Sequence, residues 1–104
     1  MKKAYVVAEV RVHNPGPYEG YRALATESVA QHNGRFLVRG GAREQREGED
    51  AQHDNSWRTV IVEFPSLAQA QAWYDSPEYR KAKDIRVANS SGRLFLVEGV
   101  ELQD

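Results

Sequence analysis

The chain of 104 residues contains no cysteine. This absence excludes disulfide bonds, thiolate catalysis and cysteine-based zinc sites, so the fold must be stable through packing alone. Long apolar runs are absent as well, because Glu9 and Arg11 interrupt the N-terminal segment MKKAYVVAEVRV. No stretch approaches the roughly 20 apolar residues of a membrane span, and the N-terminus does not continue as a signal peptide. We expect a soluble, cytoplasmic protein with no membrane partner.

Neither sign of charge is in large excess. Lys and Arg total 14 against 15 Asp and Glu, for a formal net charge of -1. The chain as a whole therefore does not attract nucleic acid. A local nucleic-acid site around the Arg-Gly-Gly run at 39–41 is the remaining alternative, but acidic residues at 44, 47, 49 and 50 cancel the charge of Arg43 and Arg46. We expect no nucleic-acid partner.

Apolar periodicity and capping residues divide the chain into strands and helices. Asn14 is placed to cap a first helix and Gly34 to end it. Ser66 and Gln69 form a capping box, and Ser76 precedes a proline that opens a third helix. The expected strands are 4–12, 35–40, 58–64 and 93–102, and the expected helices lie within 13–34, at 67–75 and from 77 onward.

This order of elements, βαββααβ, is that of a ferredoxin-like α+β sandwich. A right-handed crossover makes the first two strands parallel, with the third strand antiparallel between them and the fourth beside the first. We therefore expect one domain over residues 1–104, with a four-stranded antiparallel sheet and helices on one face only.

The face of the sheet without helices is too apolar to be left in water. Alternation assigns the helix side Val6, Ala8, Val10, Phe36, Val38, Val60, Val62, Phe64, Phe95 and Val97. The other face receives the apolar residues Tyr5, Val7, Leu37, Ile61, Leu94 and Leu96, and the charged residues Glu9, Arg11, Arg39, Glu63 and Glu98. A chain this short has no spare element to cover that face, so a second copy is expected to do so, forming a homodimer through the sheets.

The charged residues of the uncovered face have two interpretations. They form ion pairs that set the register of a non-catalytic dimeric module, or they line a polar cleft near the sheet-sheet interface. Strand direction places Arg11 and Arg39 at one end of the domain, near Tyr18, Tyr21, Trp57, Arg58, Trp73 and Tyr74. Arginines beside phenol and indole rings suit a small anionic or aromatic molecule. The competing interpretation is that these aromatic residues only fill the helix core.

The histidines give weak evidence for chemistry. His13 and His32 flank a helix and lie too far apart to share a metal ion, and His53 lies in a polar loop, so we expect no metal site. His13 is the best acid-base candidate, because it lies at the arginine-rich end. On the third helix, Arg86 shares a stripe with Tyr79. It either anchors a carboxylate or packs its stem with its charged head in water.

Several runs resemble the domain of unknown function 1330 family, within the dimeric α/β-barrel superfamily. They are FLVRGG, the Glu47-Gly48 pair, VIVEFPS, AQAWYDSPEYRKAKDIR and LFLVEGV. The resemblance implies a ferredoxin-like fold that dimerises through its sheets, and relatives in the superfamily include cofactor-free monooxygenases. The recurrent family positions match Arg39, Gly40, Gly41, Glu47, Gly48, Glu63, Trp73, Tyr74, Ser76, Pro77, Tyr79 and Arg86. One departure is the longer segment EDAQHDNSW before the third strand.

These observations favour a homodimeric protein that binds a small anionic or aromatic metabolite, and that transforms it, if at all, without a cofactor. The predicted ligand-binding residues are Tyr18, Arg39, Gly40, Gly41, Glu63, Trp73, Tyr74, Tyr79 and Arg86. The alternative is the non-catalytic interaction module. For the polar loop 42–56 two roles are open: it covers the site as a lid, or it contacts the partner subunit as a dimer clasp.

Overall fold

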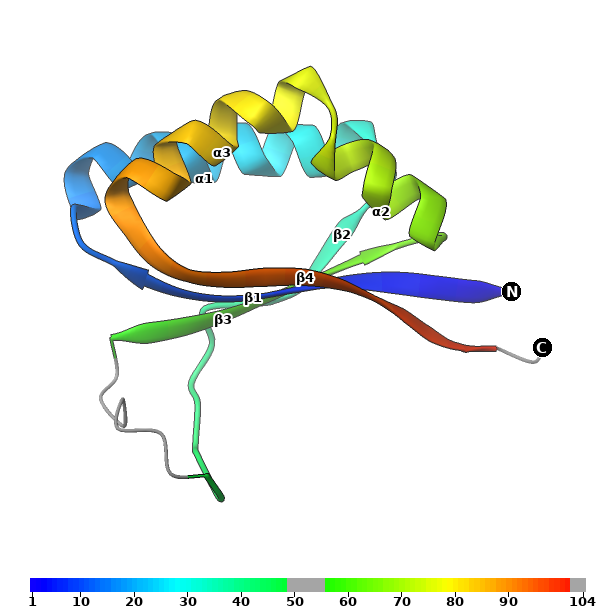
Figure 1. The fold of residues 1–104 in the computed structure, drawn as a ribbon, viewed down its shortest axis with the longest axis horizontal. Helices are drawn as coiled ribbons and strands as arrows, with labels where there is room; N and C mark the ends of the chain where they lie inside the picture. Colours follow the sequence, from blue (N-terminus) through cyan, green and yellow to red (C-terminus); the bar gives the residue numbers. More distant parts are fainter. Residues whose placement is uncertain (49–55, 102–104) are drawn as a thin grey trace.

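The computed structural model describes residues 1–48 and 56–101. Its elements are β1 (Lys2–Val12), α1 (Pro15–Gln31), β2 (Arg35–Arg39), β3 (Trp57–Phe64), α2 (Leu67–Tyr74), α3 (Pro77–Asn89) and β4 (Ser90–Glu101). The helices form one layer over a single face of the sheet (Figure 1). The predictions for His53 and for the tip of loop 42–56 fall on residues 49–55, outside the described ranges.

The sheet has the strand order β2-β3-β1-β4, and every neighbouring pair is antiparallel. Because β1 and β2 are both antiparallel to β3, they run parallel to each other, as the crossover rule requires. The predicted ferredoxin-like α+β fold is therefore confirmed. None of the helices in the described ranges is long and apolar enough to cross a membrane.

The core lies between the helices and the sheet. Val6 pairs with Val62 on the helix-facing side, and Phe64 packs 5.4 Å from Trp73 between ring centroids. The predicted caps of α2 and α3 are both present, because Ser66 accepts from the Gln69 amide and Ser76 accepts from the amide of Tyr79. These caps satisfy amides that have no partner within the helix.

The two ends of α1 differ from expectation. Asn14 holds the cap position, but its side chain makes no capping hydrogen bond and donates instead to the Asn89 carbonyl oxygen Oδ1 at 3.3 Å. At the other end the left-handed residue is Asn33, with φ 65°, and not Gly34. Gly34 is needed for space, since a Cβ there would lie 2.6 Å from the ring of Phe64. The left-handed residue that turns the chain after α1 is therefore an asparagine, a residue type that tolerates positive φ.

A bulge in β2 changes which side chains face the helices. Phe36 pairs with Val62, but Val38 pairs with Ile61, so an extra residue, Leu37, enters between them. An extra residue inverts the alternation that follows it. Arg39 consequently pairs with Val60 and lies on the helix side. The predicted positions of Val38 on the helix side and Arg39 on the uncovered face were wrong.

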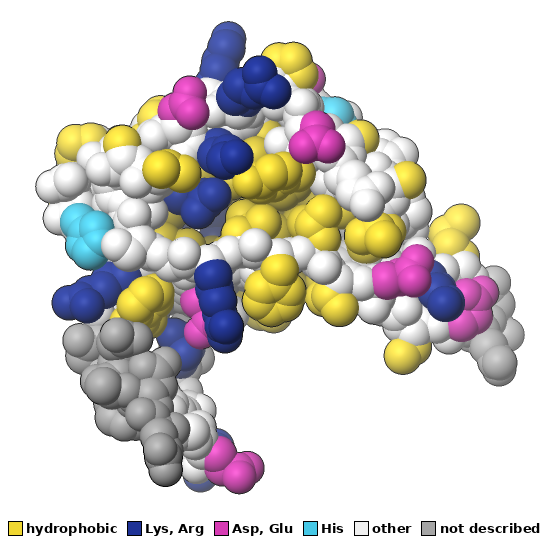
Figure 2. Space-filling model, viewed as in Figure 1, with side chains coloured by type: hydrophobic (Ala, Val, Ile, Leu, Met, Phe, Trp, Pro, Cys, Tyr) yellow, Lys and Arg dark blue, Asp and Glu magenta, His cyan; other side chains and the backbone are white. Residues whose placement is uncertain are grey.

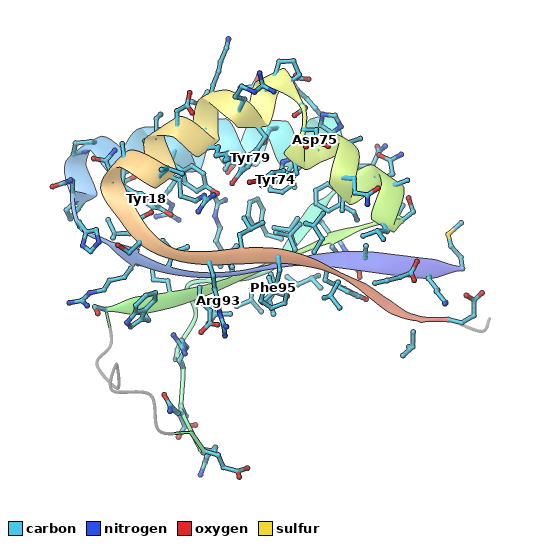
Figure 3. All side chains as sticks on the ribbon, in the orientation of Figure 1. Tyr18, Tyr74, Asp75, Tyr79, Arg93 and Phe95 are labelled. Carbon is cyan, nitrogen blue, oxygen red and sulfur yellow. The ribbon has the colours of Figure 1, made fainter. Side chains whose placement is uncertain are left out.

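The faces of β4 were also predicted the wrong way round. Leu94 pairs with Ala8 and Leu96 with Val6, so these leucines face the helices. Phe95 and Arg93 point away from the helices (Figure 3). The same error affects two further residues of β4. Val97 pairs with Tyr5 on the uncovered face, and Glu98 pairs with buried Ala4 on the helix side. The run LFLV is apolar at every position, so its pattern does not distinguish the two faces.

The corrected uncovered face remains strongly apolar. Leu37, Phe95 and Val97 are 47%, 44% and 45% exposed in the single chain. The acidic residues of this face are paired within the chain. Arg93 donates two hydrogen bonds, of 2.9 and 2.7 Å, to one oxygen of Glu9. Glu63 accepts from Arg35 at 2.9 Å and from Lys3 at 3.4 Å.

Candidate functional site

A cavity of about 320 Å³ lies between α1 and the helix-facing side of the sheet. Its volume is at the lower end of the range of small-molecule sites. It is lined by Val6, Ala8, Val10, Tyr18, Tyr21, Arg22, Ala25, Val29, Phe36, Arg39, Gly40, Arg58, Val60, Val62, Trp73 and Leu94. In Figure 2, hydrophobic side chains and Lys or Arg side chains meet in a hollow between the helical layer and the sheet. The lining combines an apolar floor with several cations.

One stripe of α1 forms the upper wall of the cavity. Tyr18, Arg22, Ala25 and Val29 recur at helical spacing and all line it, with Tyr21 beside them. The helix packs mainly against α3, so its stripe is free to face the space above the sheet. Arg22 thus occupies a position where an apolar residue would be expected.

The strands place two further arginines on the same cavity. Arg58 pairs with Val10, at the end of the inward row of β3 that continues through Val60 and Val62. Arg39 reaches the cavity because of the bulge in β2. Three guanidinium groups therefore border one mixed polar and apolar space.

The guanidinium of Arg39 is held by neutral groups. It donates to the hydroxyl of Thr26 at 2.8 Å and to the backbone carbonyl of Arg22 at 3.1 Å, and its Cζ lies 4.0 Å from the ring centroid of Phe36. Burial, and then the like charge of Arg22, lower the pKa of Arg39. Within the described ranges, no carboxylate forms an ion pair with any of the cavity arginines. Among the described residues, the positive charge at the cavity is therefore not compensated by an ion pair.

The phenols on the wall are neutral at physiological pH. Burial raises the pKa of Tyr18, against the attraction of Arg86 and Arg58. Burial, the largest cause, raises the pKa of Tyr21 well above 10. Tyr18 and Tyr21 therefore offer hydroxyl groups for hydrogen bonding and are not negative partners for the arginines.

Four of the predicted ligand-binding residues line the cavity. They are Tyr18, Arg39, Gly40 and Trp73. Gly40 has φ 72°, and its amide donates to the Thr59 carbonyl at 2.9 Å, so it turns the chain away at the rim. Trp73 is buried and directs its indole N–H to Ser28 at 3.0 Å, so it offers a ring face to the cavity and no free donor.

The other predicted residues lie elsewhere. Gly41 does not line the cavity, and Glu63 lies on the uncovered face beside Arg35. Tyr74 packs on the rings of Trp73 and Tyr79 but does not itself line the cavity.

Tyr79 and Arg86 lie behind the cavity wall. Tyr79 is fully buried, with its hydroxyl 3.3 Å from that of Tyr21, and it accepts from Arg86 Nε at 3.2 Å. Burial opposes the charge of Arg86, but the surrounding phenols, Tyr79 first, raise its pKa. Arg86 therefore bonds a phenol where the sequence suggested a carboxylate anchor.

The acid-base candidate His13 also lies outside the cavity lining. Its Nε2 is 2.6 Å from the Ser91 hydroxyl, on exposed side chains. In the part of the chain that the structure describes, no three His, Asp or Glu side chains gather as metal ligands would.

Arg22, Arg58, Phe36 and Tyr21 line the cavity but were not among the predicted site residues. A usable signal was present for both arginines. Arg22 interrupts the apolar stripe of α1, and Arg58 interrupts the inward row of β3. A cation within an otherwise apolar row indicates a cavity or a partner at that point, because burying it alone costs several kcal/mol.

The model of a family described as a domain of unknown function (DUF1330) matches residues 3–100. No curated protein matches the chain.

Solved structures share the fold at low identity. RPA0582, a protein of unknown function from Rhodopseudomonas palustris, superimposes with a TM-score of 0.72 at 21% identity, over 96% of this chain and 84% of its own. SnoaB, a cofactor-independent oxygenase from Streptomyces nogalater, superimposes with a TM-score of 0.69 at 14% identity, over 98% of this chain and 97% of its own. A dimeric ferredoxin-like protein of unknown function from Jannaschia sp. CCS1 superimposes with a TM-score of 0.63 at 15% identity, over 96% of this chain and 99% of its own.

Proposed function

Since the chain belongs to DUF1330, a family defined by a domain of unknown function, we propose a function from the cavity itself: the protein binds a small organic anion there. Arg39, with Arg22 and Arg58, holds the anionic group, and the apolar floor with Phe36 and Trp73 holds the rest of the molecule. The observation that carries this proposal is the set of guanidinium groups at one cavity with no carboxylate partner among the described residues.

The energetics favour an anion over a neutral ligand. Hydrogen bonds between charged groups contribute about 1.5–3 kcal/mol each, roughly twice the value for neutral pairs. Arg39 is already oriented by Thr26 and by the ring of Phe36, so little side-chain freedom is lost when a ligand binds. The mainly apolar lining favours an organic carboxylate over inorganic phosphate.

We propose in addition that two copies pair through the uncovered faces of their sheets. The support is the exposed apolar set Leu37, Phe95 and Val97 on a face that no element of the described chain covers. The Jannaschia protein, which shares the fold, is described as dimeric. The ion pairs that Glu9 and Glu63 form within the chain would then lie inside this interface.

Catalysis is a separate question from binding. SnoaB is a cofactor-independent oxygenase, and its likeness at 14% identity supports the fold alone. A cofactor-free conversion of the bound anion and a binding function without chemistry both stay open predictions, as does the cytoplasmic location. Anion binding is common to both functions, so it is the first property to test.

The test is calorimetric titration with 4-phenylbutanoate and with its uncharged amide. We expect the acid to bind and the amide to bind at least tenfold more weakly. Arg39→Met should weaken binding of the acid about tenfold or more, whereas Arg80→Met, which removes an exposed arginine on α3, should not. Equal binding of acid and amide, or equal effects of the two variants, would refute the proposal.

A further inference from the structure

A row of hydrogen-bonding groups runs from the buried interior of the helical layer to the cavity wall. Arg86 Nε donates to the Tyr79 hydroxyl at 3.2 Å, and that hydroxyl lies 3.3 Å from the hydroxyl of Tyr21. Arg86 and Tyr79 are on α3, whereas Tyr21 is on α1 and lines the cavity. Figure 3 shows Tyr79 between the helices and the sheet.

The direction of this row follows from the chemistry of its first member. A guanidinium is only a donor, so the oxygen of Tyr79 must accept from Arg86. Tyr79 is fully buried, and its own hydroxyl hydrogen therefore needs an acceptor inside the protein. Among the described residues, the only acceptor bonded to that hydroxyl is the oxygen of Tyr21. Either oxygen could be the donor at this distance, and among the described residues only donation from Tyr79 to Tyr21 gives the buried hydrogen of Tyr79 an acceptor.

Tyr21 is consequently left with an unused hydrogen. Its oxygen accepts from Tyr79, and no other hydrogen bond of its hydroxyl occurs within the described ranges. Tyr21 lines the cavity, and in the proposal below it donates this hydrogen to a bound molecule. The raised pKa of Tyr21 keeps the phenol protonated at neutral pH, so it acts as a donor and not as a base.

We propose that Tyr21 is a ligand-binding donor that recognises a carbonyl oxygen, so that the preferred ligand is an oxo acid: a small organic anion with a carbonyl group in addition to its carboxylate. This inference rests on the proposed function, in which the arginines hold the carboxylate. A carboxylate offers about four acceptor positions, and several guanidiniums supply more donors than it can use. Charged donors outcompete a neutral phenol for these oxygens, which leaves Tyr21 for an uncharged one.

Tyr79 and Arg86 are positioning residues in this arrangement. Neither residue itself lines the cavity, and they act by fixing which way the Tyr21 hydrogen points. Their effect should appear in the preference between two ligands and not in affinity as a whole.

The experiment compares 4-oxo-4-phenylbutanoate with 4-phenylbutanoate, which differ only in the carbonyl, by calorimetric titration. The wild-type protein should prefer the oxo acid by about tenfold, the typical effect of one hydrogen bond. Tyr21→Phe should abolish the preference and leave the affinity for 4-phenylbutanoate unchanged. Tyr79→Phe should reduce the preference, because the hydroxyl of Tyr21 then loses the donor that fixes its orientation. Circular dichroism checks that each variant is folded.

Tyr74→Phe is the matched control, since it removes a phenol hydroxyl from the same aromatic cluster at a residue that does not line the cavity. It should keep the full preference. Equal wild-type affinities for the two acids, or a preference that survives in Tyr21→Phe, would overturn the inference while leaving anion binding intact. If Tyr21→Phe lowered the affinity for both acids equally, the inference would also be overturned, because the phenol would then contact the carboxylate. If neither acid binds the wild-type protein, the proposed function fails and the inference fails with it.

Discussion

Trp73 donates its indole N–H to the hydroxyl of Ser28 across 3.0 Å, and both side chains are buried. The bond joins α2 to α1. Ser28 itself donates to the Ala25 carbonyl at 3.0 Å. Ser28→Ala leaves the indole N–H without a partner, which costs about 1–3 kcal/mol. We expect the free energy of unfolding to fall by that amount in urea denaturation followed by circular dichroism.

A double-mutant cycle with Trp73→Phe separates this bond from packing. In the Trp73→Phe background the donor is gone, so Ser28→Ala should cost clearly less than in the wild type. The same loss in both backgrounds would show that the hydrogen bond contributes nothing. All variants must be compared at one protein concentration, because self-association would otherwise shift the apparent stability.

We predict that Gly34 cannot be replaced without a loss of stability. A Cβ there would lie 2.6 Å from Phe64 Cε1 and 2.9 Å from Val29 Cγ1, and both of these side chains are buried and cannot move away. Gly34→Ala should lower the free energy of unfolding by about 1–3 kcal/mol through overpacking. Gly20→Ala is the control, since its Cβ meets only Ile85 Cδ1 at 3.5 Å, and helix propensity should make it stabilising by about 0.5–1 kcal/mol. Thermal unfolding that moved in the same direction for both would contradict this account.

Alkaline pH should destabilise the fold through Tyr21. Its pKa in the folded state is raised well above 10.0, chiefly by burial, whereas in the unfolded chain it returns to that value. The folded state therefore favours the protonated phenol. The resulting stability is complete below about pH 10 and is lost as the pH rises toward the folded pKa.

Unfolding in urea between pH 8 and 11 measures this effect. In Tyr21→Phe the decline of stability above about pH 10 should be shallower than in the wild type. Tyr18→Phe should have a smaller effect, because the pKa of Tyr18 is raised less. If the Tyr21→Phe slope equals that of the wild type, burial of this phenol does not control the alkaline limit.

The uncovered sheet face predicts the oligomeric state. Phe95 is 44% exposed in the single chain and lies between Arg93 and Val97 on the face assigned to the partner. Phe95→Glu would place unpaired charges in the centre of that interface and should convert dimers to monomers. Size-exclusion chromatography with light scattering measures the mass. Val87→Glu, which alters an exposed residue of α3, should leave the dimer intact, and a dimeric Phe95→Glu protein would place the interface elsewhere.

Local signals account for most of what could be predicted from the sequence. The Ser66 and Ser76 caps act on amides three residues away, so their sequence spacing alone defines the helix starts. The prediction that the side chain of Asn14 caps the first helix was wrong, because that side chain bonds to Asn89, which is distant in the sequence. Element order then gave the topology, since few arrangements of four strands satisfy the crossover rule.

The faces of two strands could not be predicted, for different reasons. Leu94 and Phe95 belong to a run that is apolar on both sides, so alternation carries no information there. The bulge at Leu37 depends on the pairing of β2 with β3, which no local pattern in RFLVR reveals. For the same reason Arg39 was assigned to the wrong face of the sheet, although it does line the cavity.

The bulge in β2 also means that one residue controls two surfaces at once. If β2 kept all its residues but paired without the bulge, alternation would continue after Phe36, with Val38 toward the cavity and Arg39 toward the uncovered face. Loss of the bulge would therefore remove a cation from the cavity lining and add one to the apolar face, whereas deletion of Leu37 would leave Arg39 on the helix side. In the proposed function, ligand recognition and self-association are therefore linked through the backbone geometry of one short edge strand, and we predict that related chains that lack the bulge differ in both properties together.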